Sequence, residues 1–170
     1  RLAQFLGKAE SRGLVRVISA QPRYNLLFRE MERELFPLCM EEGIGVIAYN
    51  PLAGGLLTGK HRAANGPAAG SRFALNTAAG AQYRERYWQD RELAMAHRIA
   101  ELAGEAGMDP VTLSVAWVMA NPAITAPIIG ASRAEQLDAS IAAADVVLDA
   151  DLKQRLDEMT TEFRKGDAPR

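Results

Sequence analysis

The hydrophobic positions of this chain alternate between two spacings. Over residues 2–9, apolar side chains recur every three to four positions, the period of an amphipathic helix, and Gly13 ends that pattern. Residues 14–20 and 45–49 are short apolar runs of the kind that form strands. In chain order, the pattern predicts helix 2–12, strand 14–20, helix 29–42, strand 45–49, helices 90–106 and 110–120, strand 124–129, a helix beginning at 132, and helix 150–159.

Local signals add detail to these elements. Pro37 lies inside the helix predicted over 29–42 and indicates a first turn or a kink. Ser132 and Glu135 have the spacing of a capping box. The apolar face of the helix that they open is predicted to consist of Ala134, Leu137, Ile141 and Ala144. Residues 61–86 are rich in Ala, Gly, Asn and Pro with little periodicity, which predicts a long loop that covers a ligand.

The alternation of strands and helices predicts an α/β fold, in which helices cover the faces of a parallel sheet. A closed barrel of eight such units takes about 250 residues, and the predicted strands correspond to roughly its last three units. We therefore expect residues 1–170 to form the C-terminal part of a (β/α)8 TIM-type barrel, with parallel strands and outer helices. The N-terminal half of that barrel, in the same or a separate chain, is the expected partner.

Composition and charge exclude several classes of protein. Of the 170 residues, 48% are hydrophobic and 24% are charged, and 20 basic against 21 acidic residues give a net charge of -1. This balance provides no basic surface for nucleic acid or an anionic membrane. The single cysteine, Cys39, excludes an internal disulfide and a cysteine-rich zinc site, and predicts a buried thiol in a reducing cytoplasm. Residues 110–132 lack charge, but Asn121 and Pro122 divide them into a core helix and a core strand.

The most informative stretch is 44–60, IGVIAYNPLAGGLLTGK, in which a strand leads into a glycine-rich loop with a lysine. Glycines let the backbone approach a phosphate and point N–H groups toward it. Residues 54–60 have the spacing of a P-loop, but His61 stands where a Ser or Thr would bind magnesium. Gly43, Gly45 and Ala48 match a dinucleotide fingerprint, but they lie before and within the strand. Both motifs are therefore weak.

Two successive strand ends favour a phosphate site more strongly. Ligand phosphates in (β/α)8 barrels often bind at the loops after the last two strands, near a helix N-terminus. Residues 50–60 and 130–132 are such loops, and Arg133 adds a guanidinium suited to a phosphate monoester. Tyr49 offers an aromatic face to a planar ring, and Gln21 offers a donor and an acceptor to an amide-bearing ring. At each position an ordinary turn, cap or core contact is the alternative.

Four segments closely resemble the C-terminal half of aldo-keto reductases. They are AQPRYNLL (20–27), GIGVIAYNPLAGGLLTGK (43–60), SRF (71–73) and PIIGASRAEQLDASI (127–141). The resemblance extends over essentially the whole chain and implies a (β/α)8 barrel in which NADPH reduces an aldehyde or ketone. It leaves open a regulatory barrel that senses NADP(H) with little turnover. A P-loop domain that binds a nucleoside triphosphate is a remote third reading.

The resemblance also implies which residues bind NADP(H). Gln21 matches the residue that holds the nicotinamide carboxamide, Tyr49 matches the one that stacks on the ring, and loop 50–54 follows the pyrophosphate. Lys60 and Arg72 match basic residues over the phosphates. The expected cofactor-binding set is Gln21, Tyr49, Asn50, Pro51, Leu52, Ala53, Gly54, Lys60, Arg72, Gly130, Ser132, Arg133, Gln136 and Ser140. Of these, Gly130, Ser132, Arg133 and Gln136 match the family's adenosine and 2′-phosphate site. Ala139 and Ser140 stand where the family has Glu and Asn, so the contacts to adenine are expected to differ.

No residue of this chain is expected to be catalytic. The family donates a proton from a tyrosine that a lysine, an aspartate and a histidine assist, all from the first half of the barrel. His61 lies in the predicted loop and His97 on a helical face, while Tyr83 and Tyr87 lie in the loop without a local lysine. The chain alone is therefore expected to be inactive.

Overall fold

The computed structural model describes residues 1–61 and 66–167 of the chain. Its helices and strands, in order, are α1 (Leu2–Ser11), β1 (Ser19–Ala20), α2 (Leu35–Glu41), β2 (Gly45–Tyr49), α3 (Ala78–Tyr87), α4 (Asp90–Glu105), α5 (Pro110–Met119), β3 (Ala126–Ile128), α6 (Asp138–Ala142) and α7 (Ala150–Met159). Short 3₁₀ turns join them: η1 (Glu30–Glu32), η2 (Ala53–Thr58), η4 (Arg72–Ala74), η5 (Ala134–Gln136), η6 (Ala143–Asp145) and η7 (Thr161–Lys165).

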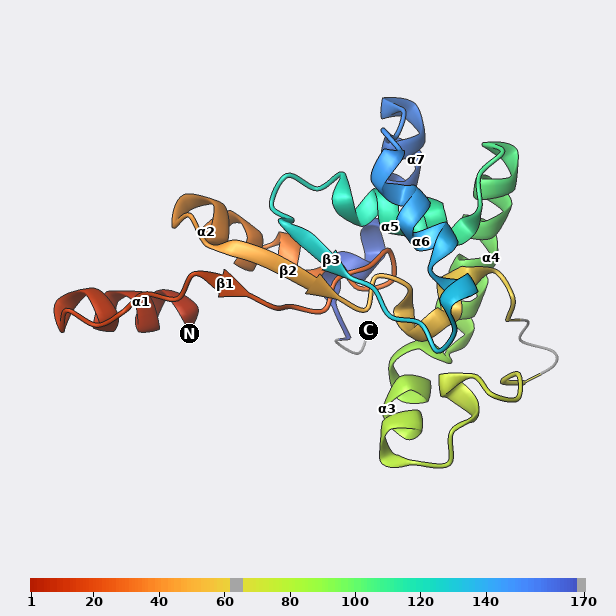
Figure 1. Ribbon diagram of the computed structural model, residues 1–170, viewed down its shortest axis with the longest axis horizontal. Helices are drawn as coiled ribbons and strands as arrows, with labels where there is room; N and C mark the ends of the chain where they lie inside the picture. The colour runs from red at the N-terminus through yellow and green to blue at the C-terminus, as the bar shows by residue number, and fades with distance from the viewer. Residues whose placement is uncertain (62–65, 168–170) are drawn as a thin grey trace.

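The strands form a parallel sheet in the order β1-β2-β3. Ser19 pairs with Gly45 at one end of β2, and Tyr49 pairs with Ile128 at the other. Because the strands are parallel, their carboxyl ends lie at one edge of the sheet, where the arrowheads of β2 and β3 point in Figure 1. The α/β class with parallel strands and surrounding helices is confirmed.

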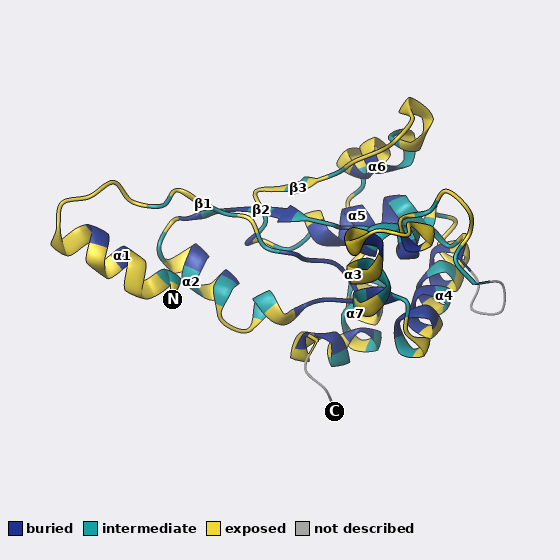
Figure 2. Cartoon of the chain, turned by 90° about the horizontal axis from the view of Figure 1, so that it is seen from below, coloured by how far each residue is buried: buried dark blue, intermediate teal, exposed yellow. Residues whose placement is uncertain are grey.

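Helix α5 lies in the core. Its residues 112–118 are all buried, and Figure 2 shows it as one of the most deeply buried segments. The Trp117 ring stacks on Tyr24 with 5.1 Å between ring centroids, and Phe36 meets Tyr24 edge-on at 4.8 Å. The core helix predicted from the uncharged stretch 110–132 is therefore confirmed. Among the described residues, no helix is long and apolar enough to span a membrane.

The helices with the clearest sequence signals match their predicted bounds to within one residue. Helices α4 and α5 end one residue before their predicted ends, and α7 has its predicted bounds. Pro110 lies in the first turn of α5, where its missing N–H costs no hydrogen bond. The Cys39 thiol is buried, as predicted, and this burial raises its pKa.

Two predicted strands are shorter in the structure. The strand expected over 14–20 is reduced to its last two residues, which form β1. Within the described residues, this segment pairs only with β2, and only through Ser19 and Ala20. Val15 and Ile18 are 90% and 81% exposed, so their side chains add little cross-strand packing that would extend the strand. The strand expected over 124–129 is reduced to β3, whose outer residues are exposed, so the prediction of a core strand was wrong.

Two further predictions were wrong about helices. The helix expected over 29–42 divides into η1 and α2, because the ring of Pro37 would clash with the carbonyl of Arg33 if the helix continued unbroken. Pro37 lies in the first turn of α2, as one of the two predictions for it stated. The loop expected over 61–86 contains η4 and most of α3, which Thr77 caps by accepting a hydrogen bond from Gly80 N. Residues 62–65 of that loop lie outside the described residues.

The capping box predicted at Ser132 does not form. Ser132 donates hydrogen bonds from its backbone N and its Oγ to Gln136 Oε1, and the chain continues as η5 followed by the short helix α6. Short 3₁₀ turns flank α6, and in such turns side chains three residues apart lie on the same face. Ser140 and Ala143 have this spacing, and both are buried. Of the predicted apolar face, three residues are exposed: Ala134, Ile141 and Ala144.

Candidate functional site

The loop after β2 is a tight turn with an unusual backbone. Asn50, Ala53 and Gly54 have φ values of 64°, 50° and 72°, in the left-handed region that side chains other than Gly rarely adopt. Asn50 stabilises this conformation, because its Oδ1 accepts a hydrogen bond of 2.7 Å from Gly54 N. Helix η2 follows and ends at Gly59, after which Lys60 is not helical. Among the described residues, neither Lys60 nor His61 is helical, so no helix begins at the lysine as a P-loop requires.

A buried polar network beneath the loop connects it to two other segments. Asn25 Nδ2 donates to Asn50 O at 2.9 Å and to the Tyr87 hydroxyl at 3.1 Å, and Asn50 Nδ2 donates to the same hydroxyl at 3.0 Å. Asn25 and Tyr87 are fully buried, and burial raises the pKa of Tyr87, so the phenol stays neutral. Asn25 was not among the predicted site residues, and Tyr87 was expected to lie in a loop. The polar Asn25 within the apolar run 24–28 was the one available signal.

Two buried arginines fix the segment that follows β1. Arg23, whose backbone forms a bridge with Tyr49, lies over the Phe28 ring with its guanidinium carbon 3.4 Å from the ring centroid, and forms an ion pair with Asp167. Arg29 binds both carboxylate oxygens of Glu32, at 2.8 and 3.0 Å. Neither arginine was singled out from the sequence. Both arginines lie in the segment after β1, which begins with Gln21.

The register of the sheet brings several predicted site residues to one edge. Tyr49 is half-buried at the end of β2; its backbone N donates to Pro22 O at 2.9 Å, and its O accepts from Tyr24 N. Gln21 is exposed immediately after β1. Since Ile128 pairs with Tyr49, Gly130 follows beside the start of loop 50–54, in which Pro51 and Ala53 are buried and Leu52 is partly exposed.

The remaining predicted residues differ in exposure. Gly130, Ser132, Arg133 and Gln136 are exposed, whereas Ser140 is buried in α6, which packs on α5. Within the described part of the chain, Arg133 and Lys60 form no hydrogen bond or ion pair through their side chains. Their charges are therefore available to an anion.

Arg72 is oriented by helix α3. Arg72 Nη1 donates to the Tyr83 hydroxyl at 2.9 Å, and its guanidinium carbon lies 5.4 Å from the centre of the Tyr83 ring. The same ring lies against Gly54, where an added Cβ would be 2.6 Å from Tyr83 Cδ1. Arg72 is thus connected through one side chain to the loop after β2.

The two histidines have structural surroundings. His61 is buried in edge-on contact with Phe73 and Trp88, and neither of its ring nitrogens has a hydrogen-bond partner among the described residues. Burial, and then the charge of Lys60, lower the pKa of His61. His97 is half-buried, and its Nε2 lies 2.9 Å from His61 O.

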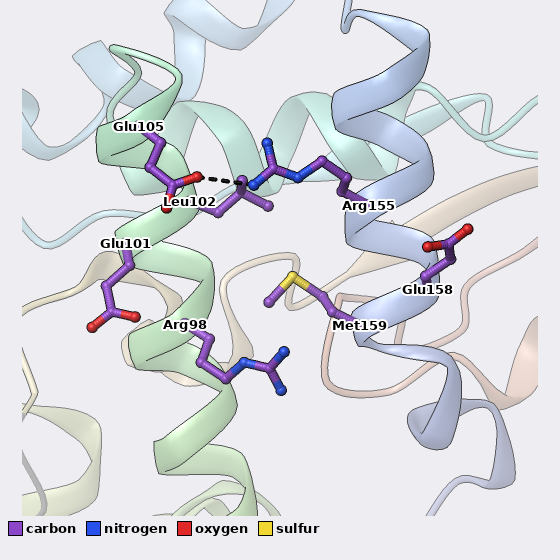
Figure 3. Close-up of a pocket in the computed structure, with 7 residues that line it drawn as sticks. All are labelled: Arg98, Glu101, Leu102, Glu105, Arg155, Glu158 and Met159. Atoms are coloured by element: carbon purple, nitrogen blue, oxygen red, sulfur yellow. Dashed lines mark hydrogen bonds and ion pairs between the residues drawn. The ribbon is translucent and has the colours of Figure 1, made fainter.

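A separate groove lies between α4 and α7. Its volume is about 490 Å³, and Figure 3 shows Arg98 on α4 and both Arg155 and Met159 on α7 pointing into the space between the two helices. The ion pair of Arg155 with Glu105 crosses it at 2.9 Å. No predicted site residue lines this groove, so it is not part of the candidate site.

Comparison with known proteins gives the family. The model of the Aldo/keto reductase family matches residues 3–161. The chain belongs to this family. The match includes each strand that the structure describes and all the predicted site residues.

Individual relatives have different names. The aldo/keto reductase chain is 36% identical over 158 residues to an uncharacterized oxidoreductase, YrpG, of Bacillus subtilis, with 93% of this chain and 45% of the relative covered. It is 34% identical to a probable voltage-gated potassium channel subunit beta of Arabidopsis thaliana, covering 86% and 44%. It is 33% identical to the human aldo-keto reductase family 7 member A3, covering 85% and 46%. The chain thus spans a little less than half the length of these relatives.

Proposed function

We propose that this chain is the NADP(H)-binding part of an aldo/keto reductase barrel that reduces an aldehyde or ketone when the barrel is complete. The observation that carries the proposal is the meeting of two loops at one sheet edge. Loop 50–54 follows Tyr49, and the loop that leads to Arg133 follows its partner Ile128. The carboxyl edge of a parallel sheet is where ligands of such folds bind.

The residues at this edge fit a dinucleotide phosphate. Asn50 fixes loop 50–54 internally, so a bound pyrophosphate would not have to order it. The exposed Lys60 and Arg133 have no other partner in the described chain, and Arg72 is directed by Tyr83. When bound, NADPH supplies the hydride, and these residues bind and orient the cofactor. The proton donor and its assisting residues belong to the partner half of the barrel.

The second candidate is a regulatory barrel that senses NADP(H) with little turnover. Some relatives are named as potassium channel subunits, and those names describe no reduction of a substrate. These relatives are the reason for the second candidate. The two candidates differ in turnover. Consumption of NADPH by the full-length protein with a panel of aldehydes supports the reductase, whereas tight NADPH binding without consumption supports the sensor.

Arg133→Ala tests the predicted 2′-phosphate site. Only NADPH carries this phosphate, so we expect its Kd to rise by about 10- to 100-fold, the loss of a charge-assisted hydrogen bond, while the Kd of NADH changes little. Titration of the full-length protein by cofactor fluorescence measures both. Arg98→Ala is the control, since Arg98 is also exposed but lies in the groove between α4 and α7. Equal losses for NADH and NADPH would refute the role given to Arg133.

A further inference from the structure

Helix α3 contacts both parts of the candidate phosphate site. It follows η4, the turn that carries Arg72, and two of its tyrosines, Tyr83 and Tyr87, are stacked one helical turn apart at 6.4 Å. The Tyr87 hydroxyl accepts the hydrogen bond from Asn50 Nδ2 described above. Tyr83 lies between Arg72 and Gly54, so a single side chain contacts both the basic residue and the loop.

The backbone next to Arg72 is fixed by the same helix. Arg84 Nη1 donates to Phe73 O at 2.7 Å and to Leu75 O at 3.1 Å, on either side of Ala74. Phe73 is fully buried and meets the Tyr83 ring edge-on at 6.4 Å. Gly80 packs so closely on η4 that an added Cβ would be 2.1 Å from Leu75 O. The turn that presents Arg72 is therefore rigidly attached to α3.

The Arg72 side chain itself has only one described anchor. Arg72 is exposed, and within the described residues it forms no ion pair; its hydrogen bond goes to the Tyr83 hydroxyl. A long, exposed arginine loses rotamer freedom when it binds an anion, which reduces its contribution to affinity. A hydroxyl that accepts one guanidinium N–H and a ring beneath the guanidinium reduce that loss while leaving other N–H groups free.

We propose that Tyr83 is a positioning residue that holds Arg72 over loop 50–54 for contact with the cofactor pyrophosphate. This inference rests on the proposed function, since it assigns the ligand of Arg72. Tyr83 touches no reacting atom and acts only through the guanidinium. The pyrophosphate is common to NADH and NADPH, so this role differs from that of Arg133, which concerns the 2′-phosphate alone.

Tyr83→Phe removes the accepting hydroxyl and keeps the ring. In the full-length protein, we expect it to raise the Kd of NADPH and of NADH alike, by about 3- to 10-fold, the loss of one positioning hydrogen bond. In an Arg72→Ala background, the same change should leave both Kd values unaltered, because the guanidinium that Tyr83 orients is gone. Thermal unfolding checks that the variants fold. Equal effects of Tyr83→Phe in the two backgrounds, or no effect in either, would overturn the proposal.

A cofactor-free measurement separates this proposal from the proposed function. The NMR order parameter of the Arg72 side chain, measured at Nε, should fall in Tyr83→Phe when no dinucleotide is present. If the wild-type protein bound neither dinucleotide, the proposed function and the pyrophosphate role would fail together. The order parameter would then still decide whether Tyr83 positions Arg72, and an unchanged value would refute that as well.

Discussion

Gly54 is the residue at which backbone conformation and packing constrain the site together. Its φ of 72° disfavours any other residue, and the Tyr83 ring occupies the space that a Cβ would take. We expect Gly54→Ala to lower the free energy of unfolding by about 2–4 kcal/mol, the sum of left-handed strain and overpacking. Chemical denaturation measures it.

Gly70→Ala is a matched control for that prediction. Gly70 has a φ of 75°, close to that of Gly54, but nothing lies within 4 Å of its added Cβ. This variant should lower the free energy of unfolding by about 1–2 kcal/mol, the contribution of the backbone strain alone. If both variants cost the same, the contact between Gly54 and Tyr83 does not constrain the loop.

His61 gives the protein a predicted pH dependence. Burial lowers its pKa in the folded state, while in the unfolded chain it takes a proton at about pH 6.5. Above that pH the imidazole is neutral in both states and has no effect. As the pH falls below it, only the unfolded state gains the proton, so stability decreases. His61→Phe should keep the aromatic contacts and flatten the decrease as the pH falls from about 7 to about 5.5. Parallel stability curves for the two proteins would contradict this role.

The residues of the site could be predicted from the sequence only in part. Tyr49 and loop 50–54 belong to one continuous motif, and the structure places them at the strand end, as the motif predicted. Asn25, Asn50 and Tyr87 are far apart in the chain, and no local pattern indicates that their side chains meet. The hydrogen bond of Arg72 to Tyr83 could not be predicted from the sequence either, because it depends on how α3 packs against η4.

At the scale of elements, local caps explain which helices were predicted well. Asp109 accepts hydrogen bonds from Val111 N and Thr112 N, and Asp149 does the same for the first residues of α7, so these helices begin where expected. Strand lengths depend instead on neighbouring strands, which is why 14–20 was predicted too long. The bounds of α6 could not be predicted either, since Gln136 binds Ser132 in place of the expected cap.

Asp109→Ala tests the cap of the central helix. The bond from Val111 N is 2.7 Å long, and its loss should lower the free energy of unfolding by about 1 kcal/mol. Asp138→Ala is the control, because Asp138 lies in the first turn of α6 and its carboxylate accepts no backbone hydrogen bond in the described structure. Thermal unfolding should show a lower melting temperature for the first variant alone. A similar decrease for both would mean that the cap contributes nothing specific.

At the scale of the whole molecule, one end carries a group of exposed apolar residues. Figure 2 shows α1 and the segment before β1 extending from the rest as a mostly exposed arm. Phe5, Leu14, Val15 and Ile18 are all more than half exposed there. An unpaired strand edge with exposed apolar side chains favours association with another surface. We expect the N-terminal half of the proposed barrel to cover this arm.

We therefore expect the 170-residue chain to self-associate when it is produced alone, and sedimentation velocity measures this. Val15→Lys should reduce association, because it places a charge on the unpaired segment before β1. Val147→Lys serves as the control: Val147 is 96% exposed, comparable to the 90% of Val15, but lies between α6 and α7. Equal reductions would indicate general hydrophobic association without a preferred edge. A monodisperse monomer that unfolds cooperatively would contradict the prediction, because the arm would then need no partner.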